Sequence, residues 1–403
     1  MQRNKPFGFL CSESHYEAAR KIAEEGIVLL KNSPVGKAEK APLLPLDASK
    51  QKRILVVGEN AIKMMTVGGG SSSLKVQREI LPLDGLISQL STLNSQLSTD
   101  YARGYVGDTI QSFDGVSVGR SLYDNRTAGL LVQEAVEKAK QADVVIFFGG
   151  LNKAGYQDSE GHDRKLYDLP YGQSGLIKAL LEVNPRLVYV NISGNPVPIP
   201  HLDKIPAVVQ AWFLGSEAGN AIASVLFGDV NPSGKLPYTW YASLGQCGAH
   251  ATGSYPGTWR EGHQIIDEEY TEDIFVGYRW TDRLKKEKPM FAFGHGLSYT
   301  TFKISNAKAD KKRITSDETV TFTVDVTNMG SMAGAETVQL YIRDLKSSLP
   351  RPVKELKGFS KVYLAPGATQ QVSITIDKSA LSFYDDRVGE WVAEPGDFEA
   401  LIG

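Results

Sequence analysis

Residues 142–150 read Ala-Asp-Val-Val-Ile-Phe-Phe-Gly-Gly, and residues 157–164 read Gln-Asp-Ser-Glu-Gly-His-Asp-Arg. The first stretch is a short, continuous apolar run, which is typical of a strand that is buried on both faces. A helical pattern begins a few residues further on, at Tyr171. The charged stretch is therefore expected on a loop at the carboxyl end of a strand, which is where open α/β sheets bind their ligands.

The same alternation of strands and helices extends from residue 1 to residue 237. Continuous apolar strands that alternate with helices predict an α/β fold, with a mostly parallel sheet sandwiched by helices. Ser14 and Glu17 have the spacing of a capping box at the start of the first helix. Strands are predicted at 53–58, 142–150, 186–192 and 207–212, and helices at 14–32, 128–141, 171–183 and 217–227.

The sequence pattern changes after Pro237. Residues 238–297 are rich in Gly, Tyr, Trp and charged residues and show little periodicity, which is typical of a loop-rich linker that wraps between domains. From Asp317 onward, apolar and polar residues alternate with a period of two, and several such strands predict an all-β sandwich. We therefore expect three segments, 1–237, 238–297 and 298–403.

The composition is that of an ordinary globular protein. Of 403 residues, 42% are hydrophobic and 22% are charged, and the formal net charge is -2 with no basic block. We therefore expect binding neither to nucleic acid nor to a membrane. The two cysteines, Cys11 and Cys247, cannot build a disulfide framework. Residues 1–6 lack the apolar segment of a signal peptide, so none is expected in this chain.

The residues alone leave two interpretations of the charged loop open. Gly161 beside Glu160 lets the backbone approach a ligand closely. Burial can keep a glutamate protonated near neutral pH, as a general acid requires. The alternative is a solvated loop whose charges form only surface ion pairs.

A second candidate loop, 67–73, reads Val-Gly-Gly-Gly-Ser-Ser-Ser and follows the predicted strand at 53–58. It matches neither of the phosphate-binding patterns G-x-x-x-x-G-K-[ST] and G-x-G-x-x-G, so a nucleotide site is not favoured. The loop is either a flexible turn or a close-approach loop whose serine hydroxyls bond a sugar. No His or Cys spacing suggests a metal, and no cofactor is expected.

Several short segments occur in a fixed order along the chain. Each one alone is weak evidence for a protein family, but the ordered series is specific evidence. The segments are 22–32 (IAEEGIVLLKN), 68–72 (GGGSS), 159–161 (SEG) with 163–164 (DR), 193–197 (SGNPV), 227–237 (FGDVNPSGKLP), 274–279 (IFVGYR) and 293–299 (FGHGLSY). With them the chain resembles the C-terminal part of glycoside hydrolase family 3, the β-glucosidases, β-xylosidases and their relatives. The resemblance implies an α/β sandwich followed by a fibronectin type III-like domain.

The resemblance also implies roles in sugar binding and catalysis. In similar enzymes the glutamate of Ser-Glu-Gly is the general acid/base, which gives this role to Glu160. A serine of the glycine-rich loop contacts the glucose in the -1 subsite, here Ser71 or Ser72. Asp158 and His162 are expected to bind substrate as well. His162 departs from the aromatic residue more usual after Ser-Glu-Gly, which bears on the preference for the aglycone.

Two further residues, Asp163 and Arg164, are expected to position the loop. The implied reaction is hydrolysis of terminal non-reducing β-D-glycosidic bonds with retention, which needs two carboxyl groups about 5–5.5 Å apart. Asp158 and Asp163 are not expected to act as the nucleophile, because they share one short loop with Glu160 and the two catalytic groups must flank the sugar.

In the family, the nucleophile is an aspartate of a preceding (β/α)8 barrel, in a motif such as Ser-Asp-Trp. That tripeptide does not occur here, and no stretch remains for a barrel of about 250 residues. We therefore expect a truncated gene product or fragment that carries the acid/base half of the site and is inactive alone.

The expected partners are a β-linked oligosaccharide or glucoside and the missing barrel. The face that would pack on the barrel should be left bare, so a homodimer or aggregation is also expected. The resemblance implies that the parent enzyme is periplasmic or secreted. The alternative, from another class, is a non-catalytic carbohydrate-binding or scaffold module, such as an inactive paralogue.

Overall fold

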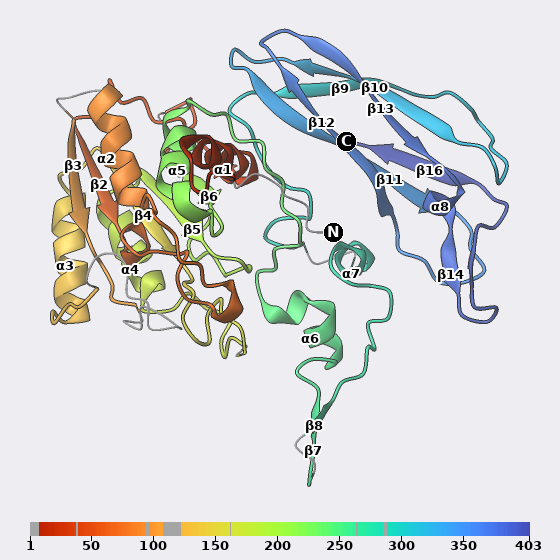
Figure 1. Cartoon of the computed structure of the whole chain (residues 1–403), viewed down its shortest axis with the longest axis horizontal. Coiled ribbons are helices and arrows are strands. Elements are labelled where there is room, and N and C mark those ends of the chain that lie inside the picture. Colours follow the sequence, from red (N-terminus) through yellow and green to blue (C-terminus); the bar gives the residue numbers. More distant parts are fainter. Residues whose placement is uncertain are drawn as a thin grey trace. The chain divides into compact units, whose positions relative to one another are not determined.

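The computed structural model describes residues 8–37, 39–93, 97–107, 122–161, 163–262, 265–284 and 288–403. The chain divides into two compact units, Met1–Gly234 and Lys235–Gly403 (Figure 1). The first unit ends close to the expected boundary at Pro237. The second takes in both the expected linker and the expected sandwich. Within the described ranges, no helix is long and apolar enough to cross a membrane.

The first unit is built on a six-stranded sheet in the order β1-β6-β5-β4-β2-β3. Neighbouring strands are parallel except for β1, which is antiparallel to β6. All residues of β4, β5 and β6 are buried, as their continuous apolar runs predicted. The strands are β1 (Val28–Asn32), β2 (Arg53–Val57), β3 (Ser98–Ala102), β4 (Val144–Gly150), β5 (Leu187–Ile192) and β6 (Ala207–Gln210).

Two groups of helices cover this sheet. The helices α1, α2 and α5 pack together in one group, and α3 packs against α4 in the other. Figure 1 shows the two groups on opposite sides of the sheet, so the predicted α/β sandwich is confirmed. The helices are α1 (Glu13–Gly26), α2 (Pro82–Leu93), α3 (Ala128–Ala139), α4 (Gln173–Val183) and α5 (Ala218–Phe227).

The order of the strands creates a switch point between β2 and β4. From β2 the chain moves to β3 on one side, and from β3 it returns to β4 on the other side of β2. From β4 it continues in the same direction to β5 and β6. A crevice forms where the direction of winding reverses, outside the carboxyl ends of the two strands.

The helix predicted at 14–32 is wrong in its second half. The helix α1 ends at Gly26, and Val28–Asn32 is the strand β1. Residues 27–30 are all buried, and a short apolar run of this kind fits a buried strand as well as a helix face. The capping box at Ser14 is also wrong, because Ser12 occupies the N-cap position without a side-chain cap bond.

The second unit contains a β-sandwich of two three-stranded sheets, β13-β10-β9 and β12-β11-β16. Alternate residues such as Val324, Val338 and Ile374 form its core, so the predicted period of two is confirmed. Its strands are β9 (Phe302–Ala309), β10 (Val320–Asn328), β11 (Gly334–Asp344), β12 (Glu355–Leu364), β13 (Thr369–Ile376) and β16 (Phe398–Ile402).

Small elements precede the sandwich and decorate it. Before it come the helices α6 (Gly248–Thr252) and α7 (Tyr278–Arg283) and the hairpin of β7 (Thr258–Arg260) with β8 (Ile265–Asp267). The short helix α8 (Lys378–Leu381) and a second hairpin, β14 (Phe383–Asp385) with β15 (Glu390–Val392), belong to the sandwich end of the chain.

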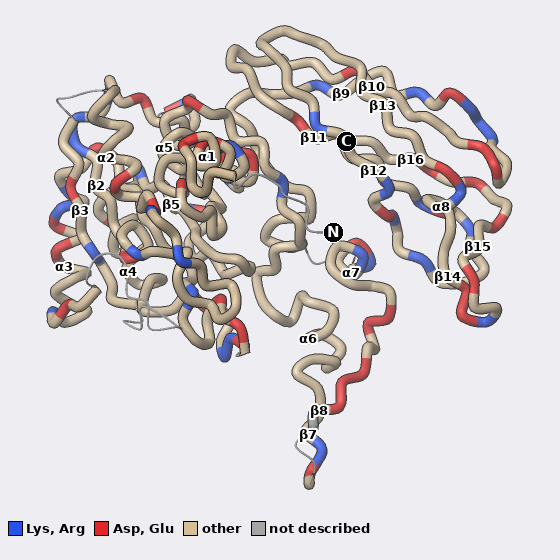
Figure 2. Tube along the Cα trace, viewed as in Figure 1, with Lys and Arg blue, Asp and Glu red and all other residues tan. Residues whose placement is uncertain are grey.

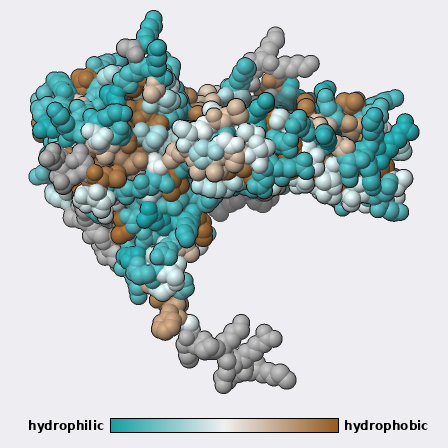
Figure 3. Space-filling view, turned by 90° about the horizontal axis from the view of Figure 1, so that it is seen from above, coloured by the Kyte–Doolittle hydropathy of each residue, from teal (hydrophilic) through white to brown (hydrophobic). Residues whose placement is uncertain are grey.

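The surface is mixed in polarity. Figure 2 shows acidic and basic positions interspersed along the chain, with an acidic run between β8 and α7. On the face seen in Figure 3, brown apolar residues are interspersed with teal and white ones. Homodimer formation therefore stays a prediction.

The helices α2 and α5 approach each other closely because glycines lie at their contact. A Cβ atom on Gly85 would overlap the backbone of Gly219, and one on Gly219 would overlap the carbonyl of Leu81. Backbone atoms on both sides cannot move away without displacing a helix, so a side chain at either position forces strain.

We expect Gly85→Ala to lower the free energy of unfolding of the first unit by roughly 2–3 kcal/mol. The matched control is Gly175→Ala in α4, where a new Cβ meets no described atom within 4 Å. This control should be neutral or raise stability by up to about 1 kcal/mol, because alanine favours helix. Denaturant titration of both variants checks this, and equal midpoints would contradict the close packing.

Candidate active site

The two candidate loops leave the sheet at the switch point. Residues 58–81 follow β2 and residues 151–172 follow β4, and these strands pair in parallel with Val57 opposite Phe147. The side-chain amide of Asn60 ties the loops at their base, because it donates to the carbonyls of Gly149 at 3.1 Å and Leu151 at 2.9 Å. The topology thus brings both loops to one edge of the sheet.

The glycine-rich loop closes tightly over Glu160. Gly68, Gly69 and Gly70 have φ angles of +91°, +82° and +81°, which side chains other than glycine rarely adopt. A Cβ atom on Gly70 would lie only 2.7 Å from the Cβ of Glu160. The backbone N–H of Glu160 donates to the carbonyl of Gly69 at 3.2 Å. These contacts support the close-approach interpretation of the loop.

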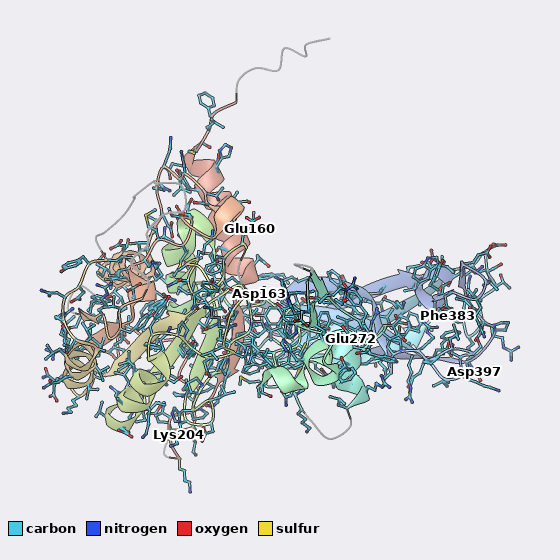
Figure 4. The ribbon with its side chains drawn as sticks, turned by 90° about the horizontal axis from the view of Figure 1, so that it is seen from below. Glu160, Asp163, Lys204, Glu272, Phe383 and Asp397 are labelled. Atoms are coloured by element: carbon cyan, nitrogen blue, oxygen red, sulfur yellow. The ribbon has the colours of Figure 1, made fainter. Side chains whose placement is uncertain are left out.

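The carboxylate of Glu160 is exposed and is held by Ser71. The Ser71 backbone N–H donates to Glu160 Oε2 at 2.7 Å, and the Ser71 hydroxyl donates to the same oxygen. These two bonds lower the pKa of Glu160 below its usual value. In the chain by itself Glu160 is exposed, so burial does not offset these two bonds. Glu160 is labelled in Figure 4.

Asp158 faces the loop that follows β5. Its carboxylate accepts a hydrogen bond from the backbone N–H of Gly194 at 2.6 Å and another from the side-chain amide of Asn195. Burial raises the pKa of Asp158, although these two bonds oppose the shift. This arrangement supports a positioning role for Asp158 more than the direct substrate contact expected from the sequence.

Arg164 also contacts the loop that follows β5. It donates to the carbonyl of Pro196 at 2.8 Å, and its guanidinium lies 5.4 Å from the centre of the Tyr167 ring. Burial lowers the pKa of Arg164. Arg164 therefore links the loop after β4 to the loop after β5, and its positioning role stays a prediction.

The remaining sequence-predicted residues differ in their placement. The Ser72 hydroxyl donates to the carbonyl of Gly69 at 3.3 Å, within its own loop. Asp163 is exposed on the β4–α4 loop and is labelled in Figure 4. His162 lies outside the described residues. Ser71 is thus the residue that the structure brings into contact with the Glu160 carboxylate.

Sequence reasoning missed two residues that hold the glycine-rich loop. The largely buried carboxylate of Glu79 accepts from the backbone N–H of Met65 at 2.7 Å and from the hydroxyl of Thr66, and burial raises its pKa. Lys153 Nζ donates to the carbonyl of Ser72 at 3.2 Å. No local pattern marks either residue, because Glu79 bonds residues 13 and 14 positions earlier and Lys153 bonds one 81 positions earlier.

The site therefore offers the exposed carboxyl group of Glu160 on a rigid support. The support comes from three loops, after β2, β4 and β5, which are cross-linked by side-chain hydrogen bonds to backbone. Such a group can donate and accept a proton, but hydrolysis with retention needs a second carboxyl group on the opposite side of the sugar. Among the described residues, no cluster of three His, Cys, Asp or Glu residues could hold a metal ion.

We expect Ser71→Ala to raise the pKa of Glu160, because the variant loses the hydroxyl donor and keeps the backbone donor. Ser72→Ala is the control and should leave that pKa unchanged, because its hydroxyl bonds Gly69. The measurement is an NMR titration of the Glu160 carboxyl carbon.

The sign for stability follows from the same shift. A lowered pKa in the folded chain stabilises it above the pKa of the unfolded chain, and this contribution is lost as the pH falls through the folded value. Ser71→Ala moves the folded pKa towards the unfolded value, so ionised Glu160 should contribute less to the free energy of unfolding. A Glu160 pKa that is the same in wild type and Ser71→Ala would contradict the contact.

Comparison with known proteins supports one family. The model of the glycosyl hydrolase family 3 C-terminal domain matches residues 27–299, and that of the fibronectin type III-like domain matches residues 336–403. A β-glucosidase of Bacteroides ovatus is 48% identical over 410 residues, which cover 100% of this chain and 52% of that protein. The thermostable β-glucosidase B of Acetivibrio thermocellus is 38% identical over 392 residues, which cover 97% of this chain and 47% of that protein.

Solved structures agree with this result. A family 3 β-glucosidase of Bifidobacterium adolescentis superposes with a TM-score of 0.82 at 32% identity, over 99% of this chain and 53% of that one. A β-glucosidase of Streptomyces venezuelae, solved in complex with D-glucose, superposes with a TM-score of 0.84 at 26% identity. The match covers 100% of this chain and 60% of that one. The chain spans about half the length of the curated relatives above. It belongs to glycosyl hydrolase family 3, whose C-terminal domain and fibronectin type III-like domain it carries.

Proposed function

We propose that this chain supplies the acid/base half of the active site of a β-glucosidase-type hydrolase. The complete enzyme hydrolyses terminal non-reducing β-D-glycosidic bonds with retention. The observation that carries the proposal is the exposed Glu160 of Ser-Glu-Gly, held at the switch point of the sheet by the glycine-rich loop. The names of the relatives, β-glucosidases, support the choice of substrate.

The proposed mechanism is a double displacement. A carboxylate nucleophile attacks the anomeric carbon while protonated Glu160 gives its proton to the glycosidic oxygen, and the aglycone leaves. The Glu160 carboxylate then takes a proton from water, whose oxygen attacks the anomeric carbon and releases the nucleophile. The nucleophile belongs to the portion of the relatives that this chain does not span, which we take to be a (β/α)8 barrel.

The first step needs Glu160 protonated, whereas Ser71 lowers its pKa in the chain by itself. Assembly of the site is expected to reverse this shift in two ways. Burial of Glu160 against the barrel and the sugar raises its pKa. The Ser71 hydroxyl is also expected to exchange its hydrogen bond to Glu160 for one to a sugar hydroxyl. The carboxylate form of Glu160 then loses a bond that favours it. Ser71, Ser72 and His162 are then the substrate-binding residues.

The positioning residues act through the loop that carries Glu160. Asp158 and Arg164 fasten this loop to the segment 194–196, and Asp163 is proposed to support it from the neighbouring position. The proposed segments stay 1–237 for the acid/base domain, 238–297 for a connecting stretch and 298–403 for the sandwich.

A non-catalytic carbohydrate-binding or scaffold module is the second candidate. One observation favours it, because the Glu160 carboxylate is already satisfied by Ser71 and its lowered pKa opposes proton donation. A module of this kind would leave the glycosidic bond intact even when the remaining half of the site is supplied.

The purified chain should not hydrolyse an aryl β-glucoside. The same chain should hydrolyse the aryl β-glucoside once it is joined to the portion of the Bacteroides ovatus relative that it does not span. In this joined protein, Glu160→Gln should lower kcat/KM by about 10²–10⁴-fold for a phenyl glucoside, whose leaving group needs a proton. The loss should be much smaller for a dinitrophenyl glucoside, whose leaving group departs as an anion.

The matched control is Glu390→Gln, because Glu390 is an exposed glutamate on β15. This variant should keep the activity of the joined protein. Equal losses of activity for both leaving groups in Glu160→Gln would contradict acid catalysis by Glu160. A stable joined protein without turnover would favour the non-catalytic module.

A further inference from the structure

A pocket lies in the second unit, at one end of the β-sandwich. Its volume is about 410 Å³, and it is lined by residues 316–319, residues 377–379, Ser382 and Trp391. The pairing of Val320 with Ile376 brings the start of β10 and the end of β13 together, so the first two segments meet. Figure 1 shows α8 and β14 at this end. Two segments distant in sequence, together with Trp391 shortly after the second, thus form one concavity of the size that small ligands use, about 300–1,000 Å³.

The wall formed by Trp391 is aromatic and open. The side chain of Trp391 is 69% exposed, and Tyr384, directly opposite it in the β14–β15 hairpin, is 53% exposed. The two rings meet edge-on, at 5.8 Å between centroids and 70° between planes. The hairpin pairing and this ring contact hold the indole in place at the pocket. An exposed, fixed aromatic face of this kind binds a ligand that is apolar on one face and polar at its edge.

The rest of the lining is polar and preorganised. The Glu318 carboxylate accepts from the backbone N–H of Thr315 at 2.8 Å, and Lys311 lies 3.2 Å from its other oxygen. The Asp377 carboxylate accepts from the backbone N–H and the hydroxyl of Ser379. These bonds lower the pKa of both carboxyl groups, which are therefore fixed, ionised acceptors. Fixed groups lose less entropy when a ligand binds.

The charges of the lining exclude several ligand classes. Asp317, Glu318 and Asp377 line the pocket with one basic residue, Lys378, so phosphate, sulfate and nucleic acid are repelled. A cationic ligand would meet Lys378 in the lining and Lys311 beside Glu318, whose charge is already balanced. Figure 2 shows both basic and acidic positions around α8. A neutral ligand is favoured by this mixture.

The lining offers both hydrogen-bond donors and acceptors. Ser316, Thr319 and Ser379 carry hydroxyls that can do either, Lys378 donates, and the carboxylates accept. A ligand that carries many hydroxyls uses all of these groups, and a pyranose ring presents an apolar C–H face to an indole. We propose that this pocket binds a neutral saccharide, with a sugar ring stacked on Trp391 and its hydroxyls bonded to Asp317, Asp377 and their neighbours. The proposal does not depend on the role of Glu160.

The test uses the full chain and two soluble probes, cellotetraose and laminaritetraose. NMR titration is expected to shift signals of residues 316–319, residues 377–379, Ser382 and the Trp391 indole N–H together. Trp391→Ala should weaken binding by about tenfold or more. Asp317→Ala, at an exposed position, should weaken it as well. Thermal unfolding of both variants checks that the sandwich stays folded.

Two controls separate this pocket from other surfaces. Trp259→Ala removes another exposed tryptophan of the same unit, on β7, and Glu160→Gln alters the candidate active site. Both variants should leave the sugar-induced NMR shifts at residues 316–319, and the affinity of the pocket for the sugars, unchanged. Binding that survives Trp391→Ala and Asp317→Ala, or no shift at this pocket with either probe, would overturn the proposal. Oligolysine that binds there more tightly than both sugars, and is released by salt, would also overturn it, in favour of a cationic ligand.

Discussion

The contact between Ser71 and Glu160 is the interaction on which the candidate site depends. It joins two loops that are distant in the sequence and that leave the sheet from neighbouring parallel strands. The three glycines before Ser71 make the contact possible, because their positive φ angles bring the backbone against the Glu160 side chain. Position and ionisation of Glu160 therefore have a common cause.

The rigidity of the site comes from groups behind it. Asp158 and Arg164 connect the Glu160 loop to the strand end next to it, and Glu79 fixes the turn from which the glycine-rich loop starts. The carboxylates of Asp158 and Glu79 are largely buried and bonded to backbone N–H groups, whereas Glu160 is exposed. The supporting carboxylates are thus buried in the domain, whereas Glu160 stays accessible to a second surface that could supply the other catalytic group.

The central sheet could be predicted from the sequence because strands such as β4 are buried on both faces and are apolar throughout. Strand β3 could not, because it is a polar edge strand in which only Ala102 is buried. Strand β1 was hidden in a helical pattern, because a run of four buried residues does not define a period. Resemblance to a family pointed to Glu160 and Ser71 as candidate site residues, but their contact and the contacts of Glu79 depend on tertiary structure.

The most direct test of this account is a crystal structure of the chain joined to the half of the Bacteroides ovatus relative that it does not span, with glucose bound. The account predicts that the Glu160 carboxyl group lies about 5–5.5 Å from a carboxylate of that half, across the anomeric carbon. It also predicts that the Ser71 hydroxyl has left Glu160 and bonds the sugar. A separation of about 6.5–9.5 Å would contradict retention. A Glu160 side chain that points away from the sugar would contradict the whole assignment.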